Sequence, residues 1–240
     1  MTEISPWILL RSGDRDEGLR RMREAFAEDR SASRTMELGV AYLWTGDFGA
    51  AFAHFDAENQ RKPYRYECFY AMAGVAKWCL NVKEEAVAHW HAGLTCAYAD
   101  GAGGVTLPLL LGAASVLSAR SFPPAEAEKL LTDRTGGNRA KIWPGPLGKY
   151  LLGHIDGGGL LSQCVNRDGS EDFLRRWQAD FYFGLRAYGR GELARFQELM
   201  RNVIVIDDDD FDLQNHRKRF VSKFWCAEFF LARSLVAPSS

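Results

Sequence analysis

The sequence lacks any pairing pattern of cysteines, any long hydrophobic run and any excess of charge of one sign. Its five cysteines are odd in number and never form a Cys-x-x-Cys pair, so neither a disulfide framework nor a zinc site is indicated. The longest nearly apolar stretch, residues 107–117, is about half as long as a membrane-spanning helix, which needs about 20 residues. A formal net charge of -1 gives no general attraction for a phosphate backbone. We therefore expect neither a membrane nor a nucleic acid as the partner.

The amino-acid composition is that of an ordinary globular protein. Apolar residues make up 47% of the 240 residues and charged residues 25%. A chain of this length can bury one large core, and we expect a single domain over residues 1–240. Residues 1–12 lack the basic head and the cleavage site of a secretory signal, which favours a cytoplasmic protein.

Three short segments share the spacing of a helical hairpin, and successive copies start 33 and 35 residues apart. Each segment has a turn-forming residue, a small residue five positions later and a large apolar residue four positions after that. The small and the large residue then share one helix face. The segments are Gly13 with Gly18 and Met22, Gly46 with Ala51 and Phe55, and Asn81 with Ala86 and Trp90.

On these positions the N-terminal half resembles a tetratricopeptide repeat, which implies helical hairpins stacked side by side. The matching residues of the central unit are Leu38, Gly39, Tyr42, Gly46, Ala51, Phe55 and Pro63. The next unit, residues 67–100, keeps Gly74, Ala86 and Trp90 but has Lys77 and Asn81 at the expected tyrosine and glycine sites. We therefore expect an all-α fold of tetratricopeptide-like stacked hairpins with an irregular glycine-rich insertion.

The hairpins are expected over residues 1–132, followed by a Gly/Pro-rich connection over 133–170 and a helical block over 171–240. Nine glycines and two prolines in the connection favour an irregular path around one apolar island, residues 147–155. The helical block is expected to contain helices over about 172–188, 192–202 and 216–235. Residues 203–206, Val-Ile-Val-Ile, have no partner strand and are expected to form a buried extended segment.

No set of residues has the spacing of a catalytic, metal or cofactor site. His89 and His91 are two positions apart on an expected helix and so point to different faces. A third, weaker hypothesis is an enzyme with a site near His154, Asp156 and Cys164, but the adjoining run of three glycines lacks the Lys and Ser or Thr of a phosphate loop. We expect a protein that is not an enzyme and that needs no cofactor and no metal.

The resemblance implies a concave groove lined by the first helix of each hairpin. In this chain the groove positions are apolar, and we propose Trp44 and Trp78 as partner-binding residues. The alternative is that a neighbouring helix covers both tryptophans, because large aromatic side chains are usually buried. The groove positions are Met36, Val40, Leu43 and Trp44 in one unit and Ala71, Val75, Trp78 and Cys79 in the next.

A second candidate partner-binding feature is a run of five carboxylates in six residues. Such a run is either a solvated loop that caps the following helix or an acidic patch that meets a basic surface, with Phe211 as its anchor. A calcium loop is a third alternative, but the central glycine and terminal glutamate of an EF-hand are missing. The run consists of Asp207, Asp208, Asp209, Asp210, Phe211 and Asp212.

Residues 96–109, with the sequence CAYADGAGGVTLPL, resemble a segment of bacterial helical proteins encoded beside polymorphic toxins. This resemblance implies an immunity protein, a cytoplasmic antidote that binds its cognate protein toxin and blocks it. The alternative is a general tetratricopeptide-like adaptor or scaffold that assembles a protein complex. Neither hypothesis specifies an oligomeric state.

Overall fold

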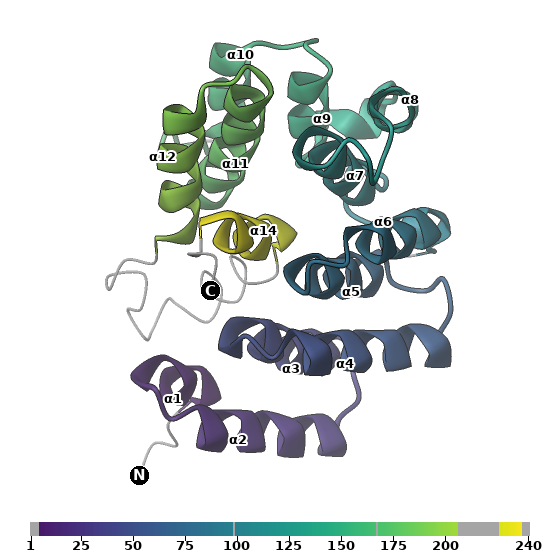
Figure 1. Ribbon diagram of the computed structural model, residues 1–240, viewed down its shortest axis with the longest axis vertical. Coiled ribbons are helices and arrows are strands. Elements are labelled where there is room, and N and C mark those ends of the chain that lie inside the picture. Colours follow the sequence, from purple (N-terminus) through teal and green to yellow (C-terminus); the bar gives the residue numbers. More distant parts are fainter. Residues whose placement is uncertain (1–4, 98, 167, 206–225, 237–240) are drawn as a thin grey trace.

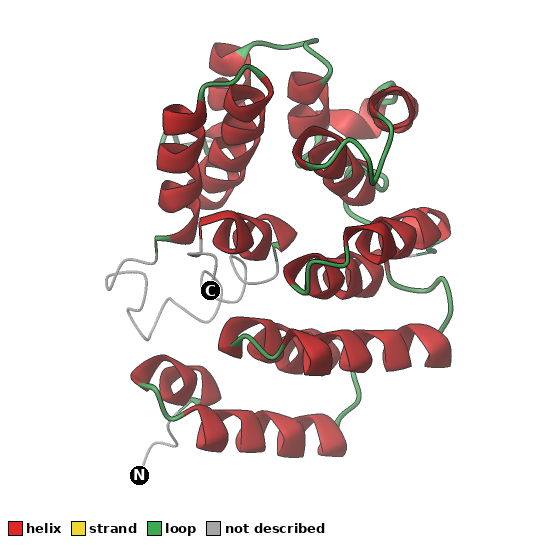
Figure 2. Cartoon of the chain, viewed as in Figure 1, coloured by secondary structure: helices red, strands yellow, loops and turns green. Residues whose placement is uncertain are grey.

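The computed structural model describes residues 5–97, 99–166, 168–205 and 226–236 of the chain. Within these ranges every regular element is a helix, and the only β-type contact is an isolated bridge between Val165 and Glu171 (Figure 2). The expected all-α class is confirmed. The α-helices are α1 (Pro6–Ser12), α2 (Arg15–Glu28), α3 (Ala32–Thr45), α4 (Phe48–Arg61), α5 (Glu67–Cys79), α6 (Lys83–Ala92), α7 (Thr106–Leu117), α8 (Pro124–Thr135), α9 (Gly145–Leu151), α10 (Gly157–Leu161), α11 (Phe173–Gly189), α12 (Leu193–Ile204) and α14 (Ala227–Val236).

Consecutive helices pack as hairpins, and the hairpins follow one another along a curved path (Figure 1). Helices α1 to α6 form three such pairs, α7 packs on α8, and α11 packs on α12. The path turns back far enough for α11 to contact α7. Helix α14 then lies inside the curve, where it contacts α5 and α12.

Three hairpins share one close contact between their two helices. Gly39 faces the ring of Phe55, Gly74 faces the indole of Trp90, and Gly184 faces Met200. In each case the large residue comes sixteen positions after the glycine. A Cβ atom on these glycines would lie 2.2, 2.2 and 2.3 Å from the facing side chain. The rigid rings at Gly39 and Gly74 leave no room for it, whereas at Gly184 the nearest atom is the terminal methyl of the flexible Met200 side chain.

The turns between paired helices also repeat. Gly13, Gly46 and Gly191 have φ angles of 93°, 81° and 77°, and Asn81 occupies the equivalent turn with a φ of 62°. Asparagine is among the few residues that tolerate this left-handed conformation. Asn81 therefore preserves the turn that glycine makes in the other hairpins.

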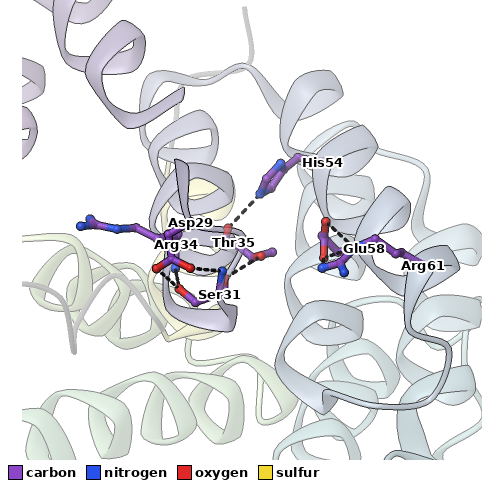
Figure 3. A network of polar contacts seen from close by, with 7 residues as sticks. All are labelled: Asp29, Ser31, Arg34, Thr35, His54, Glu58 and Arg61. Atoms are coloured by element: carbon purple, nitrogen blue, oxygen red, sulfur yellow. Dashed lines mark hydrogen bonds and ion pairs between the residues drawn. The ribbon is translucent and has the colours of Figure 1, made fainter. Parts of the chain in front are cut away.

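Local polar contacts at the start of α3 stabilise the second hairpin (Figure 3). The Ser31 hydroxyl accepts a hydrogen bond from the backbone N–H of Arg34 at 3.4 Å, which caps the helix. The His54 ring on α4 donates from Nε2 to the carbonyl of Thr35 at 2.9 Å. Burial lowers the pKa of His54, so the neutral ring is favoured in this contact.

Two expectations for the C-terminal half are corrected. The connection over residues 133–170 contains α9 and α10 and is not irregular throughout. Pro146 stands in the first turn of α9, where its missing N–H costs no hydrogen bond, and the Asp156 side chain caps α10 by accepting from the N–H of Gly159 at 2.7 Å. Leu147 and Leu160 are fully buried and hold these short helices on the core.

The prediction of a buried extended segment over residues 203–206 is also wrong for the residues that the structure describes. Val203 and Ile204 form the last turn of α12, and Val203 is fully buried on the same face as Met200. Val205 follows the helix in an extended conformation and is half exposed, at 51%. Residue 206 and the expected start of the last helix lie outside the described ranges.

We expect Gly74→Ala to lower the free energy of unfolding by about 2 kcal/mol or more, because the added methyl group overlaps the Trp90 indole. Displacement of Trp90 would also break its buried hydrogen bond to the carbonyl of Ala71, which is 2.9 Å long. Urea unfolding of both proteins measures the difference.

The matched control is Gly49→Ala on α4, where the nearest atom to the new Cβ lies at 3.9 Å. This substitution should leave stability unchanged or raise it slightly, since alanine favours the helix. Equal losses in the two variants would contradict the close packing at Gly74.

Candidate functional site

A cavity of about 370 Å³ lies where α5 meets the C-terminal helices. Small-molecule sites in proteins have volumes of about 300–1,000 Å³, so this cavity is of a suitable size. Its walls come from the start of α5, the loop over residues 99–106, the Trp143–Pro144 pair, Gln178 on α11 and the start of α14. These segments are far apart in the sequence, and the curved path of the hairpins brings them together (Figure 1).

The loop of this cavity is folded around the carboxylate of Asp100. Its two oxygens accept hydrogen bonds from the backbone N–H groups of Ala102, Gly104, Val105 and Thr106, at 2.6 to 3.1 Å, and from the Thr106 hydroxyl at 2.8 Å. The carboxylate thus satisfies donors at the start of α7, where negative charge is also favoured by the helix dipole. This arrangement fixes the loop and holds it against α5.

Glu67, the first residue of α5, lies beside this loop with 5% of its surface exposed. Its carboxyl oxygens accept from the backbone N–H groups of Asp100 at 2.8 Å and Leu107 at 3.3 Å. Burial and, secondarily, the charge of Asp100 raise the pKa of Glu67 to about 7, against the opposing effect of the two hydrogen bonds. Glu67 therefore titrates near neutral pH.

A chain of polar side chains lines the side of the cavity formed by the C-terminal helices. Trp143 Nε1 donates to Gln178 Oε1 at 2.6 Å, and Gln178 Nε2 donates to Glu228 Oε1 at 3.3 Å. The Tyr182 hydroxyl donates to the same Glu228 oxygen at 2.9 Å. Glu228 is 4% exposed, and its burial raises the pKa of its carboxyl group. The site therefore combines two buried carboxyl groups with neutral polar partners.

Glu67, Gln178 and Glu228 belong to no sequence motif, whereas Asp100 stands in the glycine-rich segment over residues 96–109. A usable signal was present for Glu228, which interrupts the apolar stripe formed by its neighbours Ala227, Phe229 and Phe230. An acidic residue on the buried face of a helix must find polar partners, and this one does so on α11.

Both candidate partner-binding tryptophans pack against other helices of the chain. Trp78 is 4% exposed and stacks on Trp90 of α6 with ring centroids 5.7 Å apart. Trp44 is half-buried and stacks on Phe229 of α14 at 6.0 Å, and the guanidinium of Arg233 donates to the Trp44 carbonyl at 2.9 Å. Helix α14 thus occupies the surface at Trp44 that a hairpin stack would leave open.

The acidic run from Asp207 to Asp212 lies outside the described residues. Its role in partner binding stays a prediction, as do the solvated-loop and calcium-loop alternatives.

The residues of the third hypothesis have local structural roles. Asp156 caps α10, and the Cys164 thiol donates to the carbonyl of Leu160 at 3.5 Å. Cys164 is 1% exposed, and burial raises the pKa of its thiol to about 11, whereas a nucleophilic cysteine needs a lowered pKa. His154 is exposed on the turn after α9.

The described residues contain no group of three or more His, Cys, Asp or Glu side chains placed to hold a metal ion. No helix within the described ranges has the length and apolar character needed to cross a membrane.

No family model, curated protein or solved structure matches this chain.

We expect the free energy of unfolding to fall as the pH rises from 5 to 8, because the folded chain holds the Glu67 proton up to about pH 7 whereas the ordinary pKa is 4.5. Below pH 4.5 the carboxyl is protonated in both states and carries no penalty. Above pH 7 the buried carboxylate costs about 3 kcal/mol, by the conversion of about 1.4 kcal/mol per pKa unit. Urea unfolding at several pH values measures this slope.

Glu67→Gln should be less stable at pH 5, since the amide cannot accept both backbone N–H groups, but its stability should depend less on pH. Glu128→Gln on α8 is the matched control, because Glu128 is exposed and should leave the slope unchanged. Identical slopes for wild type and Glu67→Gln would show that Glu67 does not titrate near neutral pH.

Proposed function

We propose that this chain acts by stoichiometric protein binding on a stack of tetratricopeptide-like hairpins. Supporting this proposal, the hairpins containing Gly39, Gly74 and Gly184 share both the sixteen-residue spacing and the close contact with a large side chain. Equivalent turns at Gly46, Asn81 and Gly191 follow the first helices of these hairpins. Arrays of such hairpins form extended recognition surfaces.

The most specific form of the proposal is an immunity protein that binds and neutralises a cognate bacterial toxin. The observation that carries it is the position of residues 99–106, which belong to the segment that resembles immunity proteins. Asp100 and Thr106 of this segment form part of the cavity wall, and the loop between them is fixed by five hydrogen bonds to one carboxylate. A rigid loop at the rim of a concave region is suited to contact a partner with little loss of conformational entropy.

Co-expression with a toxin encoded next to its gene tests this function. An immunity protein should restore growth to cells that make the toxin and should retain that single toxin in a pull-down. A chain that fails to rescue these cells is not the antidote of that toxin, and retention of several unrelated proteins would instead support the adaptor alternative.

We expect the change of Asp207, Asp208, Asp209 and Asp210 to asparagine to slow association with the partner about tenfold at low salt, because an acidic patch steers a basic surface toward it. The dependence of the association rate on salt should become flatter, while thermal unfolding should stay unchanged. Stopped-flow or surface-based kinetics at several salt concentrations measure both effects.

A control variant neutralises Glu126, Glu128 and Asp133, three exposed acidic residues in α8, and thereby changes the net charge elsewhere. This variant should bind at a nearly unchanged rate. An unchanged rate in the Asp207–Asp210 variant as well would show that the acidic run is only a solvated loop.

A further inference from the structure

Two buried carboxyl groups line the central cavity. Glu67 and Glu228 both line it and are 5% and 4% exposed. The described lining residues include no Lys, Arg or His, and neither glutamate forms an ion pair with any residue of the described ranges. Burying a carboxylate without a counter-charge is costly, so a cation in this cavity would bind favourably.

One carboxyl oxygen is free to receive such a group. Both printed contacts of the Glu228 side chain, from Gln178 and Tyr182, are made by Oε1. Within the described part of the chain no side chain donates a hydrogen bond to Oε2, although the residue is more than nine-tenths buried. Since Glu228 lines the cavity, this acceptor is available to a ligand inside it.

The remaining lining is suited to hydrocarbon. Met72, Ala71 and Ala227 provide apolar surface, while Tyr66 and Trp143 provide aromatic rings. The guanidinium groups of Arg65 and Arg175 already lie over these two rings, 5.3 and 5.8 Å from the ring centroids. The rings therefore add apolar surface, which together with the aliphatic wall can bury a short alkyl chain. The lining therefore favours a ligand with a charged head and an apolar body over a bare metal ion, which prefers several oxygen ligands.

We propose that this cavity binds an organic cation, an ammonium or guanidinium group on a short hydrocarbon chain, with its charged head hydrogen-bonded to Glu228. The same chemistry is offered by a free small molecule and by a Lys or Arg side chain of a bound protein. In the second case the inference deepens the proposed protein-binding function by naming the side chain that the partner inserts.

Calorimetric titration of the full chain with butylguanidinium tests the site without any partner protein. The neutral N-butylurea has nearly the same shape and should bind at least about tenfold more weakly, because it carries no charge. Glu228→Gln should weaken butylguanidinium binding to a similar extent. This variant keeps the oxygen that accepts from Tyr182 and Gln178, so the contacts between α11 and α14 can persist.

Glu128→Gln is the matched control and should bind as the wild type does. Circular dichroism and thermal unfolding check that Glu228→Gln is folded. If it is not folded, Ala227→Leu, which fills the cavity with apolar atoms and keeps Glu228, should abolish binding instead.

A capped tripeptide with arginine in the middle distinguishes the two sources of the cation. Tighter binding of the tripeptide than of butylguanidinium supports a partner's side chain, and the reverse order supports a free small molecule. Equal binding of butylguanidinium and butylurea, or binding that both cavity variants leave unchanged, would overturn the proposal. Toxin rescue is measured separately, so failure of either proposal does not decide the other.

Discussion

The architecture depends on the close approach of two helices at a residue without a side chain. Where Gly39, Gly74 and Gly184 stand, a large side chain from the second helix of the hairpin lies against the backbone of the first. This contact sets how near the two helices come and therefore how thick each hairpin is. The hairpins follow one another along a curved path, and this curve brings α7 and α11 into contact.

The cavity is a consequence of this curvature. Helix α14 contacts both α5 and α12, and its first residues complete a wall that the start of α5 and the loop over residues 99–106 begin. The chain tolerates two buried carboxyl groups at this place because each has fixed donors: backbone N–H groups for Glu67, and the side chains of Gln178 and Tyr182 for Glu228. These donors reduce the penalty of burial without supplying positive charge.

The sequence alone could predict the features that depend on short-range spacing. The turn, the small residue and the large residue of each N-terminal hairpin lie within nine positions of one another, and Asn81 could be placed as a turn from its chemistry.

The short helices α9 and α10 were not predicted from the sequence. In α9 and α10 helix propensity is low, and burial of Leu147 and Leu160 against distant segments supplies the missing stabilisation. Val203 and Ile204 have the β-branched side chains of a strand, but with no partner strand they extend α12.

The cavity could not be predicted from local patterns. Glu67 and Glu228 are 161 positions apart, and nothing near either residue shows that the chain returns to bring them to one place. The tryptophans illustrate the same limit, because whether Trp44 forms an open groove or a covered surface depends on the position of α14. Helix periodicity identifies an apolar face, but only the tertiary arrangement decides what covers it.

The contact between Arg233 and Trp44 joins positions 189 residues apart, and the Cys79 thiol donates to the Phe230 carbonyl across 151 residues. During synthesis the early hairpins emerge long before the helix that covers them. Until residues 227–236 leave the ribosome, the face of Trp44 that stacks on Phe229 lacks its cover, and exposed apolar surface makes nascent chains prone to aggregation or to capture by chaperones. Closure by so distant a segment also implies slow folding, because a long loop must be ordered before its contacts repay the cost.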